Sequence, residues 1–383
     1  MRELFQDRIN RLTAYKALHG FSLGLVSIFI PIYVAQQGFD PFSVFLFLMV
    51  DVAAFTLVAM PVGKIVSWLG IESSLLISSI LYVLVFVILQ AASLNYALIY
   101  SVAFLIGLAK AFHWIPVNTE FTAGSDESDR GRSYGKLEGL PKILSPLAPL
   151  IGAIVMSSLG FSFLVALSLL FAVFSVIPLT FAKDKGKPGF KTSGLLNTSN
   201  YDLWILYFLD GFATTAYVFI FPLFIYYIIG GALNVGSAKT FMAIGAGLFS
   251  IATGKISDRI SHEKMLLAGS ISSATVYLFI PGLQSRYWAF ILSFTAGLTY
   301  TIYTVPLISI VADVAEGKNL TGFFSVREVF QGSGKITVVG LLLYMIKYDS
   351  LSAAFGYTFT IAAVAVIMIA LQSRHVKAKR LQT

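Results

Sequence analysis

The stretch SVFLFLMVDVAAFTLVAMPVG, residues 43–63, holds one ionisable side chain, Asp51, among its twenty-one residues. At 1.5 Å per residue, a helix of this length covers about 30 Å, the thickness of the hydrocarbon layer of a bilayer. Apolar runs of about this length recur along nearly the whole chain of 383 residues. The sequence therefore predicts a membrane protein with many spanning segments.

The composition supports this class. Hydrophobic residues make up 57% of the chain and charged residues only 12%, with a mean hydropathy of +0.82, whereas a soluble chain carries about a quarter charged residues. The absence of cysteine excludes disulfides and thiolate metal sites. The net charge of +8 comes from cations in short loops, where they set orientation in a bilayer. We therefore expect the lipid bilayer as a partner and no nucleic acid.

Apolar runs bounded by Gly, Pro, Asn and charged residues predict twelve helical spans. The runs are too long and too uniformly apolar for the strands of a membrane barrel, so we expect an all-α membrane protein. The expected spans lie near residues 12–36, 43–63, 73–93, 96–118, 137–158, 161–182, 203–229, 234–253, 265–282, 287–311, 323–346 and 350–372.

The loops predict orientation and domain boundaries. Nearly all loop lysines and arginines fall on one side of the twelve-span plan, which predicts that both termini are cytoplasmic and that the protein lies in the cell membrane. A stretch rich in Lys, Gly, Ser and Asn reads as a flexible linker. We expect a six-helix bundle over 1–182, a cytoplasmic linker over 183–202, and a second bundle with a basic cytoplasmic tail over 203–383.

The two halves repeat each other at an offset of 190 to 191 residues. Leu18-His19-Gly20-Phe21 matches Leu209-Asp210-Gly211-Phe212, and Pro116 matches Pro306. Matches of glycine, proline and charge in register indicate duplication rather than chance among apolar residues. Six spans is an even number, so both copies cross the membrane in the same direction. In such parallel repeats a substrate site forms near the midplane between the halves.

This plan resembles the major facilitator superfamily over the whole chain. The second half carries that family's cytoplasmic loop motif as Gly254-Lys255-Ile256-Ser257-Asp258-Arg259-Ile260-Ser261-His262-Glu263-Lys264, whereas the first copy has Ser67 and Trp68 at the Asp-Arg positions. The resemblance implies twelve helices in two six-helix repeats and a conformational latch in the second half. Its expected residues are Gly254, Asp258, Arg259 and Lys264. We also expect a monomer.

Ionisable residues inside the spans are candidates for function, because burying a charge in hydrocarbon is costly. His19 and Asp210 occupy equivalent positions, roughly eight residues or about 12 Å inside the cytoplasmic face. The functional interpretation is a titrating pair that faces across a cavity and couples proton movement to transport. The alternative is a static polar contact between the halves. Glu120 is the third candidate for proton coupling.

Lys110, His113 and Glu120 share one helix face, within an arc of about 80°. The second-half counterparts of the first two are Tyr300 and Tyr303. A cationic wall opposite aromatic and hydroxyl groups favours an anionic or zwitterionic organic solute. Alternatively, Lys110 is a salt-bridge partner of Asp210 or Glu120. The expected substrate-binding residues are Lys110, His113, Thr214, Tyr217, Tyr300 and Tyr303. Charges expected instead to form salt bridges between the halves are Asp51, Lys142, Lys239 and Lys335.

The leading hypothesis is a secondary transporter that moves a small organic solute by alternating access, driven by protons in symport or antiport. An uncoupled facilitator, and a receptor or lipid-handling protein with the same fold, stay open as alternatives. Gly332-Ser333-Gly334-Lys335 fails as a phosphate-binding loop, because Val329 replaces the first glycine. No metal-ligand spacing or nucleophile context is present, so we expect no enzyme activity, no cofactor and no metal.

Overall fold

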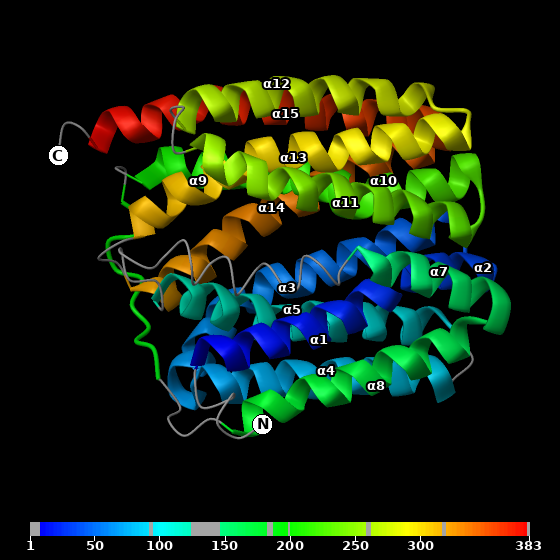
Figure 1. Ribbon diagram of the computed structural model, residues 1–383, viewed down its shortest axis with the longest axis horizontal. Coiled ribbons are helices and arrows are strands. Elements are labelled where there is room, and N and C mark those ends of the chain that lie inside the picture. Colours follow the sequence, from blue (N-terminus) through cyan, green and yellow to red (C-terminus); the bar gives the residue numbers. More distant parts are fainter. Residues whose placement is uncertain are drawn as a thin grey trace. The chain divides into compact units, whose positions relative to one another are not determined.

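The computed structural model describes residues 8–91, 95–123, 146–181, 187–197, 200–257, 262–315 and 319–380. Within these residues every regular element is a helix (Figure 1). Ten of the described helices are long and apolar enough to cross a membrane, and a shorter apolar helix covers Leu147–Leu159. Each of the twelve expected spans overlaps a described helix. The prediction of an all-α membrane protein is confirmed.

The first half contains seven described helices. They are α1 (Arg8–Val26), α2 (Phe29–Gln36), α3 (Pro41–Leu69), α4 (Ile71–Ala91), α5 (Tyr96–Ala123), α7 (Leu147–Leu159) and α8 (Phe161–Thr180). The second half has more elements because its first span is divided into several helical segments. Its elements are α9 (Tyr201–Thr215), η2 (Ala216–Ile220), α10 (Phe221–Phe224), η3 (Ile225–Ile229), α11 (Ala232–Ser257), α12 (His262–Phe279), η4 (Ile280–Gly282), α13 (Arg286–Ala315), α14 (Leu320–Tyr348) and α15 (Leu351–Arg380).

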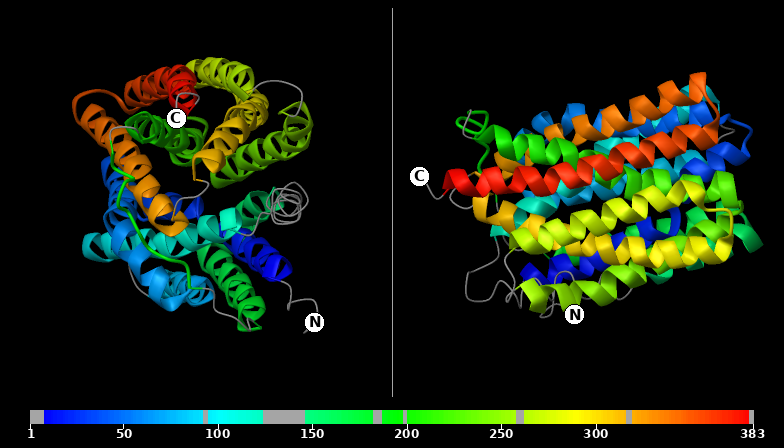
Figure 2. Two further views of the ribbon diagram at one scale, coloured as in Figure 1. Left: turned by 90° about the vertical axis from the view of Figure 1, so that its left-hand side faces the viewer. Right: turned by 90° about the horizontal axis from the view of Figure 1, so that it is seen from above.

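The helices gather into two compact units. The first unit comprises residues 1–39, 50–192 and 318–329, and the second comprises 40–49, 193–317 and 330–383. In the first unit α1 packs against α8, and α4 against α5. In the second, α13 packs against both α11 and α12, and α15 packs against α9 and α12. The end-on view in Figure 2 shows the helices of each unit bundled side by side. The domain boundaries expected from the linker stay a prediction.

Close helix approaches repeat between the units at the same offset as the sequence. In α5, a Cβ on Gly107 would overlap the backbone oxygen of Asp51 in α3. In α13, a Cβ on Gly297 would overlap the backbone oxygen of Met242 in α11. Gly297 lies 190 positions after Gly107, and Met242 lies 191 positions after Asp51. Small residues let membrane helices approach at backbone distance, so the duplication preserves a packing contact as well as a sequence pattern.

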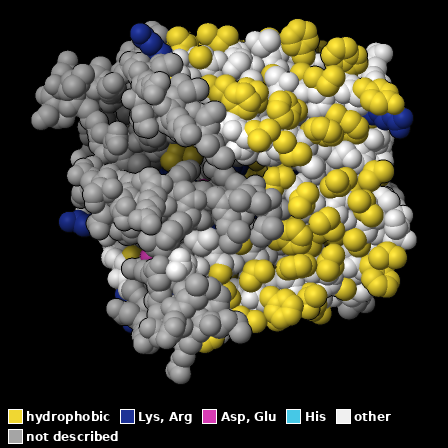
Figure 3. All heavy atoms as spheres, in the orientation of Figure 1, with side chains coloured by type: hydrophobic (Ala, Val, Ile, Leu, Met, Phe, Trp, Pro, Cys, Tyr) yellow, Lys and Arg dark blue, Asp and Glu magenta, His cyan; other side chains and the backbone are white. Residues whose placement is uncertain are grey.

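Large hydrophobic side chains cover the outside of the helices. Ile80, Leu248 and Phe279 are each more than 60% exposed, at 63%, 61% and 67%. Figure 3 shows hydrophobic side chains gathered over the described part of one face. An exposed apolar surface of this extent is unusual for a soluble monomer. It fits contact with lipid tails, as the spans require.

Residues 187–197 of the expected linker form only a turn but are held by contacts. The ring of Phe190 approaches Gly63 within the first unit, and Gly322 leaves room for the backbone oxygen of Lys191. In the second unit the Trp204 indole N–H donates to the carbonyl of buried Leu195 over 2.8 Å. The sequence predicted a flexible tether here, because composition alone does not reveal these anchors.

Candidate functional site

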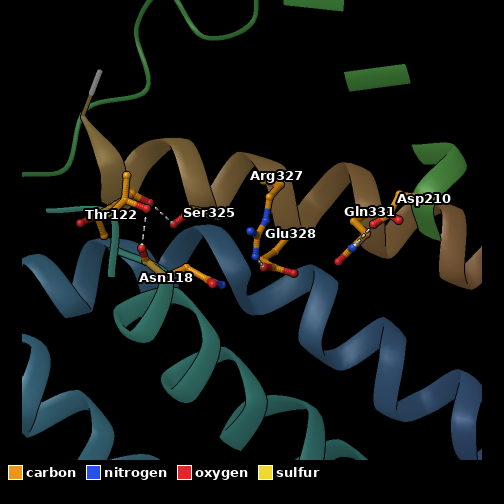
Figure 4. A network of polar contacts seen from close by, with 8 residues as sticks. Asn118, Thr122, Asp210, Ser325, Arg327, Glu328 and Gln331 are labelled. Atoms are coloured by element: carbon orange, nitrogen blue, oxygen red, sulfur yellow. Dashed lines mark hydrogen bonds and ion pairs between the residues drawn. The ribbon is translucent and has the colours of Figure 1, made fainter. Parts of the chain in front are cut away.

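The Asp210 carboxylate lies at the centre of a buried polar cluster in the second unit. It is 6% exposed and projects from α9. The Tyr303 hydroxyl, on α13, donates a hydrogen bond to its Oδ1. The Gln331 side-chain amide, on α14, donates to its Oδ2, and Figure 4 shows these two side chains pointing toward one another. Each carboxylate oxygen therefore has a neutral donor, which stabilises a negative charge away from water.

An aromatic group extends from this carboxylate. The rings of Tyr303 and Tyr300 meet edge to face at 5.6 Å, and Tyr300 stacks on Tyr217 at 4.0 Å with an interplanar angle of 2°. Thr214, on α9, lies near the Tyr300 side chain. The four second-half residues expected to bind substrate are thus brought together beside Asp210. They are Thr214, Tyr217, Tyr300 and Tyr303.

Tyr217 lies in a π-helical turn rather than in a regular α-helix. The turn, η2, follows α9 directly. Pro222, two residues beyond η2, has no N–H to donate to the carbonyl of Val218, so the regular ladder of hydrogen bonds is interrupted here. Single π-helical turns inside α-helices are frequent at functional sites. The π-helical turn therefore sets the direction of the Tyr217 side chain. A regular period of 3.6 residues per turn does not predict that direction.

A second cluster surrounds His19 in the first unit. The His19 ring is fully buried and stacks on His113 at 4.7 Å and on Tyr15 at 5.1 Å, with Tyr82 edge-on at 5.3 Å. The Tyr15 hydroxyl and His113 Nδ1 share a hydrogen bond of 3.0 Å. Neither ring nitrogen of His19 has a hydrogen-bond partner among the described residues. Buried polar atoms without partners are rare in proteins. The unpartnered ring nitrogens therefore make His19 a candidate for a functional role.

Sequence reasoning missed Tyr15 and Tyr82. Tyr15 precedes His19 by four residues, a spacing that places two side chains on the same helix face. That signal was present in the sequence. Tyr82 comes from α4, and nothing in the spacing along the chain connects it to His19. The assignment of His19 and Asp210 to proton coupling stays a prediction.

Lys110 forms an ion pair with Asp51. Its amine, on α5, donates to Asp51 Oδ2 on α3, and both residues belong to the first unit. The sequence predicts Asp210 or Glu120 as the alternative partners of Lys110 and predicts Asp51 in salt bridges between the halves. Glu120 is itself buried, at 4% exposure. The described ion pair of Lys110 lies within one unit, because α3 and α5 approach closely at Gly107.

The expected latch is described only in part. Gly254 belongs to the last turn of α11, and Lys264 is an exposed residue of α12. Asp258 and Arg259 lie outside the described residues. In the first copy of the motif, the Lys64 amine lies 5.4 Å from the centre of the Trp68 ring. The latch therefore stays a prediction.

Across the described residues, no group of three or more His, Asp or Glu side chains is arranged to hold a metal ion. The chemistry offered by the two clusters is binding and proton exchange. The second unit combines a carboxylate, hydroxyls and stacked rings, and the first unit combines two imidazoles with two phenols. Neither cluster contains an activated nucleophile.

Comparison with known proteins places this arrangement in context. Residues 203–382 match the family model described as Major Facilitator Superfamily. The E. coli fucose:proton symporter is similar in structure, with a TM-score of 0.66, 15% identity, and coverage of 97% of this chain and 99% of that one. A POT family transporter in complex with a thioalcohol-conjugated peptide gives a TM-score of 0.74 at 13% identity, covering 96% of each chain. No curated protein sequence matches this chain significantly.

Proposed function

We propose that this chain, whose residues 203–382 match the Major Facilitator Superfamily model and which shares the fold of solved transporters, moves a small organic solute by alternating access and couples this movement to protons. The observation that carries the proposal is the buried Asp210 carboxylate, which is hydrogen-bonded by Tyr303 and Gln331 and is continuous with the stacked Tyr300 and Tyr217. A titratable group beside a binding surface lets protonation and solute binding influence each other.

His19 is the corresponding group in the first unit. It is buried without a hydrogen-bond partner among the described residues and stacks on His113. An imidazole in this position can accept a proton when the cluster opens to water. We assign Asp210, His19 and Glu120 to proton coupling, and the second-unit tyrosines with Thr214 to the solute. In this proposal Asp51 neutralises Lys110. Lys110 and His113 then shape the first-unit wall of the solute site.

The printed names of two structural neighbours support this proposal. One is named as a proton symporter and the other was solved with a peptide conjugate bound. Both are less than a fifth identical to this chain, so they support the transporter fold and leave the solute to be determined by this chain's own residues. We further propose that both termini are cytoplasmic, as the basic loops predict.

Reconstitution into liposomes tests the proposal. Purified protein is inserted in proteoliposomes, an inward proton gradient is imposed, and uptake is measured for a panel of radiolabelled organic acids, amino acids, peptides and sugars. We expect at least one solute to accumulate, and a protonophore to abolish the accumulation. Flux that a protonophore leaves unchanged would contradict proton coupling and favour a facilitator. Absence of flux for the whole panel, in either direction of the gradient, would contradict transport.

A further inference from the structure

Lys239 carries a positive charge into the middle of the second unit. Its amine lies 5.5 Å from the centre of the Tyr217 ring. Tyr217 is 16 residues from Tyr201 and 12 from Ile229, the ends of its membrane span, which places it about 18 Å or more along the helix from either end. The Lys239 amine therefore does not extend toward the lipid headgroups, as lysines near helix ends usually do. It reaches inward to an aromatic ring.

Within the described part of the second unit, no carboxylate lies within 4 Å of this amine. The cluster's own carboxylate, Asp210, accepts hydrogen bonds from Tyr303 and Gln331. A cation over an aromatic face is stabilised by the ring, most strongly when both are desolvated. An unpaired charge within a membrane span costs more than this stabilisation. The contact with the Tyr217 ring alone therefore does not offset the cost of placing the Lys239 charge inside the span.

Comparison of the two repeats shows that the second unit lacks an acidic residue at the position of Asp51. In the first unit the cation Lys110 is neutralised by Asp51, at the close approach marked by Gly107. The equivalent position to Asp51 in the second unit is Met242, at the close approach marked by Gly297. The first unit thus supplies its own counterion at this contact, whereas the second places an apolar methionine there. This contact therefore supplies no counterion for Lys239.

We propose that Lys239 binds the carboxylate of an organic anion whose apolar body lies against the stacked rings of Tyr217 and Tyr300. All three side chains are partly exposed, whereas Tyr303 is fully buried. The reachable part of the cluster is therefore one cation beside two aromatic surfaces. This combination selects a monocarboxylate with an aromatic or aliphatic body over a sugar or a cation. The π-helical turn holds Tyr217 in the direction that the amine meets.

This inference rests on the proposed function, since it names the solute class of the same cluster. The test measures binding and is independent of transport. Full-length protein in phosphatidylcholine nanodiscs, which present no competing anionic lipid, is titrated with benzoate, 3-phenylpropanoate and hexanoate. The matched neutral probes are benzamide, 3-phenylpropanamide and hexanamide. Binding is followed by calorimetry and by the thermal unfolding midpoint.

We expect the carboxylates to bind and the amides to bind at least about tenfold more weakly, a difference equivalent to about 1.4 kcal/mol. Lys239→Gln should remove this preference, and Lys239→Arg should retain most of it. The control is Lys347→Gln, because Lys347 also lies over a tyrosine, Tyr348, at 5.8 Å, but is an exposed residue at the end of α14. That variant should bind as the unaltered protein does.

Three outcomes would overturn the assignment. They are carboxylate binding that is unchanged in Lys239→Gln, equal loss in Lys347→Gln, and absence of binding for all three carboxylates. The unfolding midpoint without added probe shows whether Lys239→Gln is folded, and Lys239→Arg supplies the comparison if it is not. Failure of the proposed function is distinct, because it appears as missing proton-driven flux in liposomes while the carboxylate preference and its dependence on Lys239 persist.

Discussion

The Lys110 amine donates a hydrogen bond to the Asp51 carboxylate beside a close approach of α5 and α3. Gly107, one turn before Lys110, has no side chain to hold the two backbones apart. The Asp51 side chain is 3% exposed and the Lys110 side chain 21%. Because the two charges neutralise each other inside one unit, we interpret the pair as a structural contact between two helices. The candidate for binding an anion is therefore Lys239 in the other unit.

Removing one partner of this ion pair should destabilise the protein more than removing both. Lys110→Met leaves Asp51 charged and buried, and such changes cost about 3 kcal/mol or more. The double variant with Asp51→Leu removes both charges, so we expect most of that loss to be recovered. Chemical unfolding of the two single variants and the double variant measures the coupling. Strictly additive losses would show that the pair contributes nothing jointly.

The glycines where α9 crosses α14 should resist substitution. A Cβ on Gly211 would overlap the Gln331 backbone oxygen, and a Cβ on Gly334 would overlap that of Phe208. We expect Gly211→Ala or Gly334→Ala to lower stability by about 1–3 kcal/mol, as overpacking does. The unfolding midpoint of purified protein measures this. Gly20→Ala is the control, because no atom lies within 4 Å of the added Cβ although Gly20 is the repeat counterpart of Gly211. Equal losses at both positions would contradict the packing explanation.

Neutralising Asp210 should uncouple transport from protons. Asp210→Asn keeps the shape of the side chain and removes its ability to release a proton, so we expect gradient-driven accumulation to fall about tenfold or more while solute exchange persists. Asp202→Asn provides the control on the same helix, since Asp202 also accepts a hydrogen bond from a glutamine, Gln372, over 2.9 Å. Accumulation is measured in proteoliposomes with and without a pH gradient. Full accumulation in Asp210→Asn would exclude this residue from coupling.

The anchor between Trp204 and Leu195 should protect the segment between the bundles. Trp204→Phe keeps the stacking on Phe330, whose ring lies 5.3 Å away, but removes the indole N–H. Loss of a buried hydrogen bond of this kind costs about 1–3 kcal/mol, so we expect trypsin to cut faster after Lys191. Timed digestion followed by mass spectrometry measures the rate. Trp288→Phe is the control because Trp288 is 65% exposed, and equal acceleration there would argue against a specific anchor.

The sequence determined the helices, the membrane class, the duplication and most of the candidate residues. Hydropathy and spacing are properties of short segments, and 43–63 already predicts its helix without knowledge of any neighbour. Equivalent positions in the repeat also identified Asp210 and the second-unit tyrosines, because alignment of the two halves shows where ionisable and aromatic residues replaced one another.

Only the tertiary structure decided which side chains meet. The spacing along α5 suggested one continuous stripe, but Lys110 pairs with Asp51 whereas His113 meets Tyr15 and His19. The direction of Tyr217 depends on a π-helical turn, and the counterion of Lys110 depends on how closely two helices approach at Gly107. Contacts between helices are set by rotation and crossing distance, which depend on packing of residues far apart in the chain.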